Sequence, residues 1–79
     1  MRVESDHKIE FSVIVTCYYE EKSIDEFHSR LSATMQSLGR SYEIIMINDG
    51  STDGTFEKIK AIYEKDENVS TIIDFYRNA

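Results

Sequence analysis

Polar and aromatic side chains follow three short apolar segments of this sequence. Thr16, Tyr18 and Glu20 come at the end of the first segment, residues 48–54 follow the second, and Arg77 follows the third. An aromatic ring can stack on a nucleobase, a carboxylate can accept hydrogen bonds from it, and a guanidinium can neutralise phosphate. Any one of these loops is more simply explained as a turn of the chain. A nucleotide site is predicted only if the fold brings all three together.

The apolar pattern alternates between β-branched runs and stripes with spacings of three and four. It predicts strand, helix, strand, helix and strand over residues 9–17, 23–39, 42–47, 56–68 and 69–76. Ser23 with Glu26 three positions later predicts a capping box at the start of the first helix. Gly39 is expected to end that helix, because glycine adopts positive φ readily.

This alternation predicts an α/β fold with a parallel sheet and right-handed crossovers. The second strand is apolar at consecutive positions, which is typical of a strand that is covered on both faces. We therefore expect a three-layer, Rossmann-like half domain, with three parallel strands in β-α-β-α-β order, over residues 9–79 after a tail of residues 1–8. The carboxyl ends of parallel strands share one edge, so the three polar segments should meet there. Because the sequence stops directly after the third strand, we expect it to be part of a longer domain.

Composition excludes several classes of function. The 79 residues carry a net charge of -6, and no basic cluster is present to bind nucleic acid or an anionic membrane. The one cysteine cannot form an intrachain disulfide. No apolar stretch approaches the roughly 20 residues of a membrane span. A cytoplasmic location is the expectation.

Two runs carry a resemblance to a known family. Residues 11–21 (FSVIVTCYYEE) and 42–55 (YEIIMINDGSTDGT) are similar to the first strand and to the second strand with its acidic loop in the inverting glycosyltransferases of A-type fold. That family includes dolichol-phosphate mannose synthases and bactoprenol glucosyltransferases. Residues 76–78 (YRN) resemble the end of its third strand. The similarity extends from about Ile9 onward and implies the N-terminal part of that fold.

The resemblance also implies a binding site for a nucleotide sugar. By position, Asp49 would accept from a ring N–H of uracil or guanine, Tyr18 would stack on the base or flank it, and Thr16 would line its pocket. Glu20 and Arg77 would lie near the ribose and the diphosphate. The family moves a hexose from a UDP- or GDP-sugar to a lipid phosphate or a glycan.

The sequence departs from the family pattern at three positions. The family usually has proline at Thr16, asparagine at Tyr19 and aspartate at Asn48. The motif that binds Mn²⁺ or Mg²⁺ in the family, and its catalytic base, would follow residue 79. No catalytic residue or metal ligand is therefore assigned here, and we expect this chain alone to bind no metal and to catalyse no transfer. Contact with a membrane would come only from further C-terminal segments.

Other interpretations of the acidic loop are weaker. A calcium-binding EF-hand loop that began at Asp49 would need a glutamate at its twelfth position, which is Lys60. A dinucleotide-binding turn needs glycines in residues 17–22, where there are none. A receiver-like signalling module would use Glu20, Glu21 and Asp49 as its acidic cluster.

A non-enzymatic role remains open beside these. The third strand, residues 69–76, is apolar and would lie at an unprotected sheet edge, so a homo-oligomer formed through that edge is expected.

Overall fold

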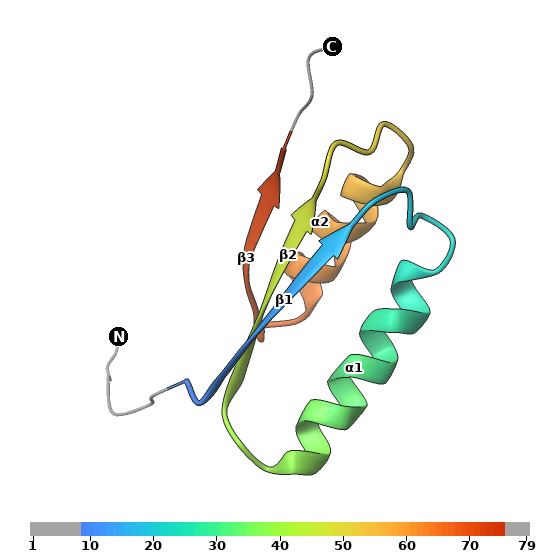
Figure 1. Ribbon diagram of the computed structural model, residues 1–79. Coiled ribbons are helices and arrows are strands. Elements are labelled where there is room, and N and C mark those ends of the chain that lie inside the picture. Colours follow the sequence, from blue (N-terminus) through green and yellow to red (C-terminus); the bar gives the residue numbers. More distant parts are fainter. Residues whose placement is uncertain (1–8, 76–79) are drawn as a thin grey trace.

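The predicted order of strands and helices is confirmed by a computed structural model of the chain, which describes residues 9–75 (Figure 1). The elements are β1 (Phe11–Cys17), α1 (Ile24–Leu38), β2 (Tyr42–Asn48), α2 (Thr55–Lys65) and β3 (Val69–Asp74). The polar segments that follow β1 and β2 both lie at the upper end of the sheet in Figure 1.

The three strands form one parallel sheet in the order β1-β2-β3. β1 and β2 pair in continuous register from Phe11 opposite Tyr42 to Cys17 opposite Asn48. The pairing of β2 with β3 shifts by one residue, because Ile44 lies opposite Val69 and Ile45 lies opposite Thr71. Both β1 and β3 are outer strands of the described sheet.

The helices cover one face of this sheet. In Figure 1, α2 lies behind the strands and α1 runs alongside β1. Burial alternates along β2, where Ile44 and Met46 are almost fully buried and Ile45 and Ile47 are only half-buried. The predicted three-layer arrangement is therefore not formed by residues 9–75, which make two layers. Two right-handed crossovers that step in the same direction across a sheet place both helices on the same face.

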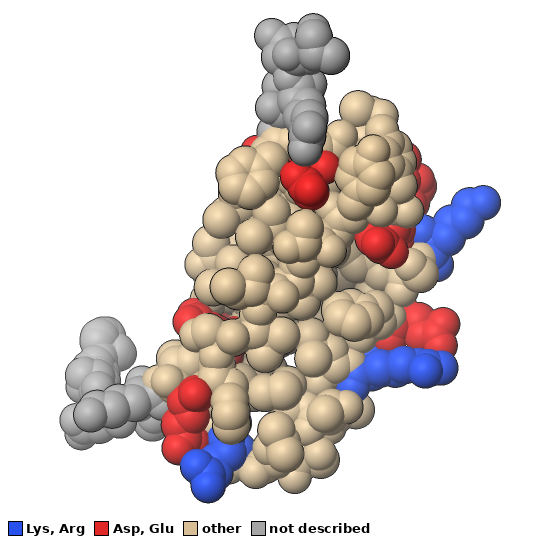
Figure 2. All heavy atoms as spheres, in the orientation of Figure 1, with Lys and Arg blue, Asp and Glu red and all other residues tan. Residues whose placement is uncertain are grey.

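The core lies between that face and the helices. Its most deeply buried members are Ile24, Ile44, Met46 and Ile59. The opposite face is open, and its centre is largely uncharged. Ile14 on β1 is 64% exposed, and Figure 2 shows uncharged side chains over the centre of this face, with acidic groups toward its upper and lower ends.

Of the two predictions for the ends of α1, one is confirmed and one is wrong. Gly39 ends the helix in the left-handed conformation at φ 67°, and its N–H donates to the Gln36 carbonyl. Ser23 makes no capping box. Its N–H and that of Ile24 donate to the Glu20 carbonyl at 3.0 and 2.9 Å, while its hydroxyl donates to the Glu20 carboxylate. This turn already satisfies two donors, and Glu26 pairs with Arg30 instead.

No helix among residues 9–75 has the length and apolar character needed to cross a bilayer.

Candidate functional site

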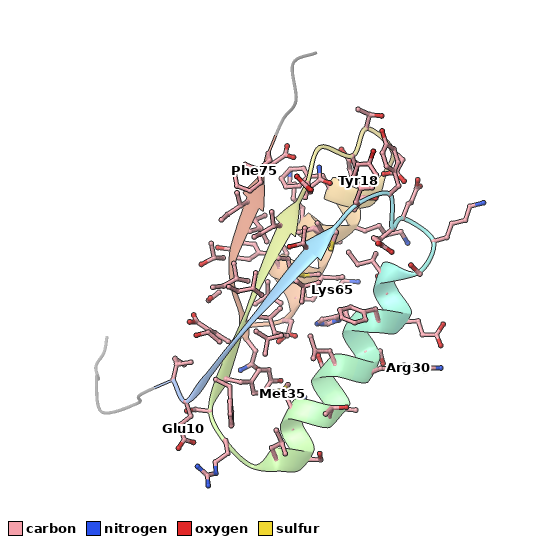
Figure 3. The ribbon with its side chains drawn as sticks, viewed as in Figure 1. Glu10, Tyr18, Arg30, Met35, Lys65 and Phe75 are labelled. Atoms are coloured by element: carbon pink, nitrogen blue, oxygen red, sulfur yellow. The ribbon has the colours of Figure 1, made fainter. Side chains whose placement is uncertain are left out.

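Four of the five predicted site residues lie at or near the carboxyl end of the sheet. Tyr18 directly follows β1 and Asp49 directly follows β2, and the Asp49 N–H donates to the carbonyl of Cys17 at 2.9 Å. Tyr18 is 59% exposed, whereas Asp49 is half-buried. Thr16 is exposed near the end of β1, and Glu20 is half-buried in the following loop. Figure 3 shows Tyr18 at the same end of the sheet as Phe75, which follows β3. Arg77 lies outside the described residues.

The loop after β1 is bonded to the loop after β2 through Tyr19. The Tyr19 N–H donates to Ser51 Oγ at 2.7 Å, and the Tyr19 hydroxyl lies 3.0 Å from Thr52 Oγ1. Tyr19 has a φ of 54°, in the left-handed region that residues other than glycine, asparagine and aspartate rarely adopt. Its ring also meets the ring of Tyr18 edge to face, with centroids 4.6 Å apart.

Thr55, at the first position of α2, makes the second connection between these loops. It is fully buried, and its hydroxyl accepts from the Glu20 N–H at 3.0 Å and donates to the Asp53 carboxylate. The Glu21 carboxylate accepts from the Gly54 N–H at 2.9 Å. A Cβ at Gly54 would lie only 2.5 Å from Glu21 Oε2, so glycine allows this close approach.

The N-terminus of α2 is occupied by carboxylates of the chain itself. In the structure the Gly54 and Thr55 N–H groups donate to the carboxylates of Glu21 and Asp53. Asp53 precedes the N-cap residue, Gly54, and its carboxylate accepts from the first N–H of the helix. A diphosphate at this helix end would meet two carboxylates, so its neutralising charge must come from elsewhere.

Asn48 joins the ends of β2 and β3. It is 1% exposed, and its amide nitrogen donates to Asp74 Oδ1 at 2.8 Å and to the Ser51 carbonyl at 3.3 Å. Its amide oxygen accepts from the Ser51 N–H at 3.3 Å. The Asn48 side chain therefore bonds to polar groups of the chain itself. The next residue, Asp49, supplies the carboxylate at the rim.

Two pockets flank the rim. One of about 290 Å³ lies between β1 and α1 and is lined by Val15, Thr16, Cys17, Glu20, Ser23, Ile24 and Phe27. The other, of about 270 Å³, lies where β2 and β3 end and α2 begins, and is lined by Asn48, Gly50, Ser51, Thr52, Asp53, Phe56, Glu57 and Asp74. Of the predicted site residues, Thr16 and Glu20 line the first pocket, and the second is built from the acidic loop.

The thiol in the first pocket is not poised for nucleophilic chemistry. Burial, together with the nearby Glu20 carboxylate, raises the pKa of Cys17 to about 11. The thiolate, which is the nucleophilic form, is therefore scarce at neutral pH. Among residues 9–75, no three histidine, cysteine, aspartate or glutamate side chains are placed to hold a metal ion. The described residues therefore do not fit a metal site.

Tyr19 is the residue of this rim that sequence reasoning missed. Its departure from the asparagine usual in the resembled family was the available signal, since asparagine tolerates the left-handed conformation better than tyrosine does. The partners of Tyr19 were not predictable in this way, because Ser51 and Thr52 lie more than thirty residues further along the chain.

A parallel sheet with crossover helices, and with polar loops gathered beyond the carboxyl ends of its strands, defines the class of nucleotide-binding α/β domains. The sequence comparisons narrow this class. Residues 12–74 match the profile of glycosyl transferase family 2, and the chain belongs to that family.

Three similar proteins share one name. The chain is 38% identical over 63 residues to an undecaprenyl-phosphate 4-deoxy-4-formamido-L-arabinose transferase of Salmonella paratyphi A, a match that covers 78% of this chain and 19% of that protein. The transferase of the same name from Pseudomonas paraeruginosa is 42% identical over 55 residues, covering 70% of this chain and 16% of the relative. That of Pseudomonas aeruginosa is 36% identical over 67 residues, covering 85% and 20%. The chain thus spans about a fifth of the length of these relatives.

Proposed function

We propose that this chain forms the nucleotide-binding part of a glycosyltransferase that moves a sugar from a UDP- or GDP-sugar to a lipid phosphate. Family membership supports the reaction class. The acceptor class follows from the names of the relatives, which contain undecaprenyl-phosphate. The proposal keeps the cytoplasmic location that the sequence favours.

One observation carries this proposal: Tyr18 and Asp49 stand side by side at the ends of neighbouring strands. The Asp49 N–H bonds directly to the residue before Tyr18, so the ring and the carboxylate belong to one rim. A base placed there would have an exposed aromatic face to stack on and a carboxylate to accept its imide N–H. Uracil and guanine both present such an N–H, so both nucleotides satisfy the arrangement.

Binding of UDP and GDP to the 79-residue chain, measured by calorimetry with and without Mn²⁺, tests the proposal. We expect Asp49→Asn to weaken binding at least about tenfold, because a hydrogen bond to a charged acceptor is exchanged for a weaker one. Glu57→Ala is the matched control, since it removes one negative charge from the edge of the same rim. It should change affinity by no more than about twofold.

Two results would contradict the proposal. The first is wild-type protein that binds neither nucleotide at millimolar concentration, and the second is equal weakening by Asp49→Asn and Glu57→Ala. In the same preparation we expect no transfer of sugar from a nucleotide sugar, because residues 9–75 hold no cluster that fits a metal. Measurable turnover by the purified chain would show that this last expectation is wrong.

A further inference from the structure

We propose that Tyr19 is a positioning residue of this site, which fixes the ring of Tyr18 so that a nucleobase can stack on it. The inference rests on the proposed function. It goes beyond that function by assigning a role to a side chain that would itself contact no ligand.

The backbone of Tyr19 shows that its conformation is imposed by its surroundings. Among the described residues other than glycine, Tyr19 alone has a positive φ, at 54°. The Cβ of an L-residue crowds the following carbonyl oxygen in this conformation, so tyrosine adopts it only where other contacts hold it. The backbone bond from the Tyr19 N–H to Ser51 Oγ, 2.7 Å long, is one such contact.

The side chain of Tyr19 is held at its far end as well. Its hydroxyl lies 3.0 Å from Thr52 Oγ1. The residue therefore has one contact at each end with the loop after β2, and its ring lies between them. A ring anchored at both ends can act as a fixed surface for a neighbouring group.

That neighbouring group is the ring of Tyr18. The two rings meet edge to face, with centroids 4.6 Å apart and an interplanar angle of 85°, which is a favourable geometry for an aromatic pair. Tyr18 as a whole is nonetheless 59% exposed, so the contact limits the rotation of its ring without burying the residue. A ring that is already fixed loses less conformational freedom when a base stacks on it, and affinity rises accordingly.

The test compares Tyr19→Asn and Tyr19→Phe in the 79-residue chain. Asparagine tolerates the left-handed backbone and keeps the N–H that bonds Ser51, but it removes the ring. We expect Tyr19→Asn to weaken UDP binding about three- to tenfold, the range expected when one side chain must be ordered on binding. We expect Tyr19→Phe, which keeps the ring contact, to stay within about twofold of wild type.

Near-ultraviolet circular dichroism of the unliganded chain supplies a second measurement. The coupled signal of the two tyrosine rings should disappear in Tyr19→Asn, while the far-ultraviolet spectrum stays unchanged. Tyr63→Asn is the matched control, because Tyr63 is an exposed tyrosine on α2, remote from the rim loops in sequence. It should leave UDP affinity as in wild type.

The outcomes separate this inference from the proposed function. If Tyr18→Ala abolishes UDP binding but Tyr19→Asn binds like wild type, Tyr19 has no positioning role and the proposed function stands. If Tyr19→Phe weakens binding as much as Tyr19→Asn does, the edge-to-face contact between the two rings contributes nothing to binding, and the inference is overturned. A chain that binds neither UDP nor GDP, or for which Tyr18→Ala has no effect, overturns both.

Discussion

At the scale of single residues, Asn48 shows how this chain accommodates a departure from its family. The resembled family usually has aspartate at this position. Here the side chain is buried and its amide donates to the Asp74 carboxylate at 2.8 Å. An aspartate at position 48 would instead face a second carboxylate at hydrogen-bonding distance. The amide is thus matched to the acid at the end of β3.

We expect Asn48→Asp to lower the free energy of unfolding by about 2–4 kcal/mol, because it replaces a donor with a buried like charge. Chemical denaturation monitored by circular dichroism measures this change. Adding Asp74→Asn to the same protein should recover about half of the loss, since it removes the repulsion. If the two substitutions are simply additive, the amide and the carboxylate are not energetically coupled.

Glu43, on the open face of the sheet, should make the free energy of unfolding depend on pH. Its carboxylate accepts from the hydroxyls of Ser12 and Ser70 at 2.6 and 2.7 Å, across all three strands. These two bonds lower the pKa of Glu43 below its ordinary value of 4.5. A carboxylate with a depressed pKa in the folded state stabilises the fold above the unfolded pKa, and this contribution is lost as the pH falls through the folded value.

The free energy of unfolding should therefore decrease as the pH is lowered below about 4.5, and part of that decrease should be absent in Glu43→Gln. Denaturation curves of both proteins between neutral and acidic pH give the comparison. The double variant Ser12→Ala/Ser70→Ala keeps the carboxylate but removes its donors, and should give a profile close to that of Glu43→Gln. Parallel profiles for wild type and Glu43→Gln would contradict the assignment.

The sequence predicted the position of Tyr18 and Asp49 at the rim, but not the contacts between the rim loops. Tyr18 and Asp49 were predictable, because each directly follows an apolar strand and parallel strands end at one edge. The bonds from Tyr19 to Ser51, from Glu20 to Thr55 and from Gly54 to Glu21 each join residues more than thirty positions apart. Their pairing depends on how the two loops lie in space, which spacing along one chain does not encode.

At the scale of elements, the energetic cost of a left-handed backbone conformation can be measured at Gly39 without a steric contribution. It ends α1 at φ 67°, and a Cβ added there would find no atom within 4 Å. Gly39→Ala should therefore cost about 1–2 kcal/mol of stability, from the left-handed conformation alone. Thermal unfolding checks the value. Gly39→Asn should cost less, because asparagine tolerates this region; an equal cost for both would point to a cause other than φ.

Helix and strand positions were predictable because the apolar period changes from two to 3.6 between elements. The ends of the elements were less so. A turn replaces the predicted capping box. The N–H groups of Ser23 and Ile24 donate to the Glu20 carbonyl, so they do not need a side-chain acceptor. The apolar stripe of α1 was also only partly buried. Ile24 and Met35 pack in the core, whereas Phe27 and Leu38 are about half exposed.

At the scale of the whole molecule, the sheet has one covered face and one open face. The consecutive apolar residues of β2 predicted a strand that is covered on both faces, yet among the described residues both helices lie on the same side. Which face a helix covers follows from the strand order and the hand of the crossovers, and the strand order cannot be read from local pattern. Self-association is one way to cover what remains exposed, and we propose it for this chain through β3.

Light scattering on two matched variants tests this proposal. Ile73 on β3 lies opposite Ile47, and Ile14 on β1 lies opposite Ile45, so both point to the open face from outer strands. If β3 forms the contact, Ile73→Lys should give a monomer at concentrations where wild type and Ile14→Lys associate. Dissociation by Ile14→Lys instead would assign the contact to β1, and a wild-type monomer at high concentration would exclude association.

The register shift in β3 restricts how tightly such an assembly could hold. Ser70 is passed over between the partners of Ile44 and Ile45, so a regular ladder on this strand runs only from Thr71 to Asp74. An incoming strand would gain few backbone bonds before it met the irregularity, and irregularities of this kind are a common means of discouraging uncontrolled strand addition. Any partner strand on β3 would therefore exchange rapidly, and it would be easily displaced by a competitor that covers the open face as well.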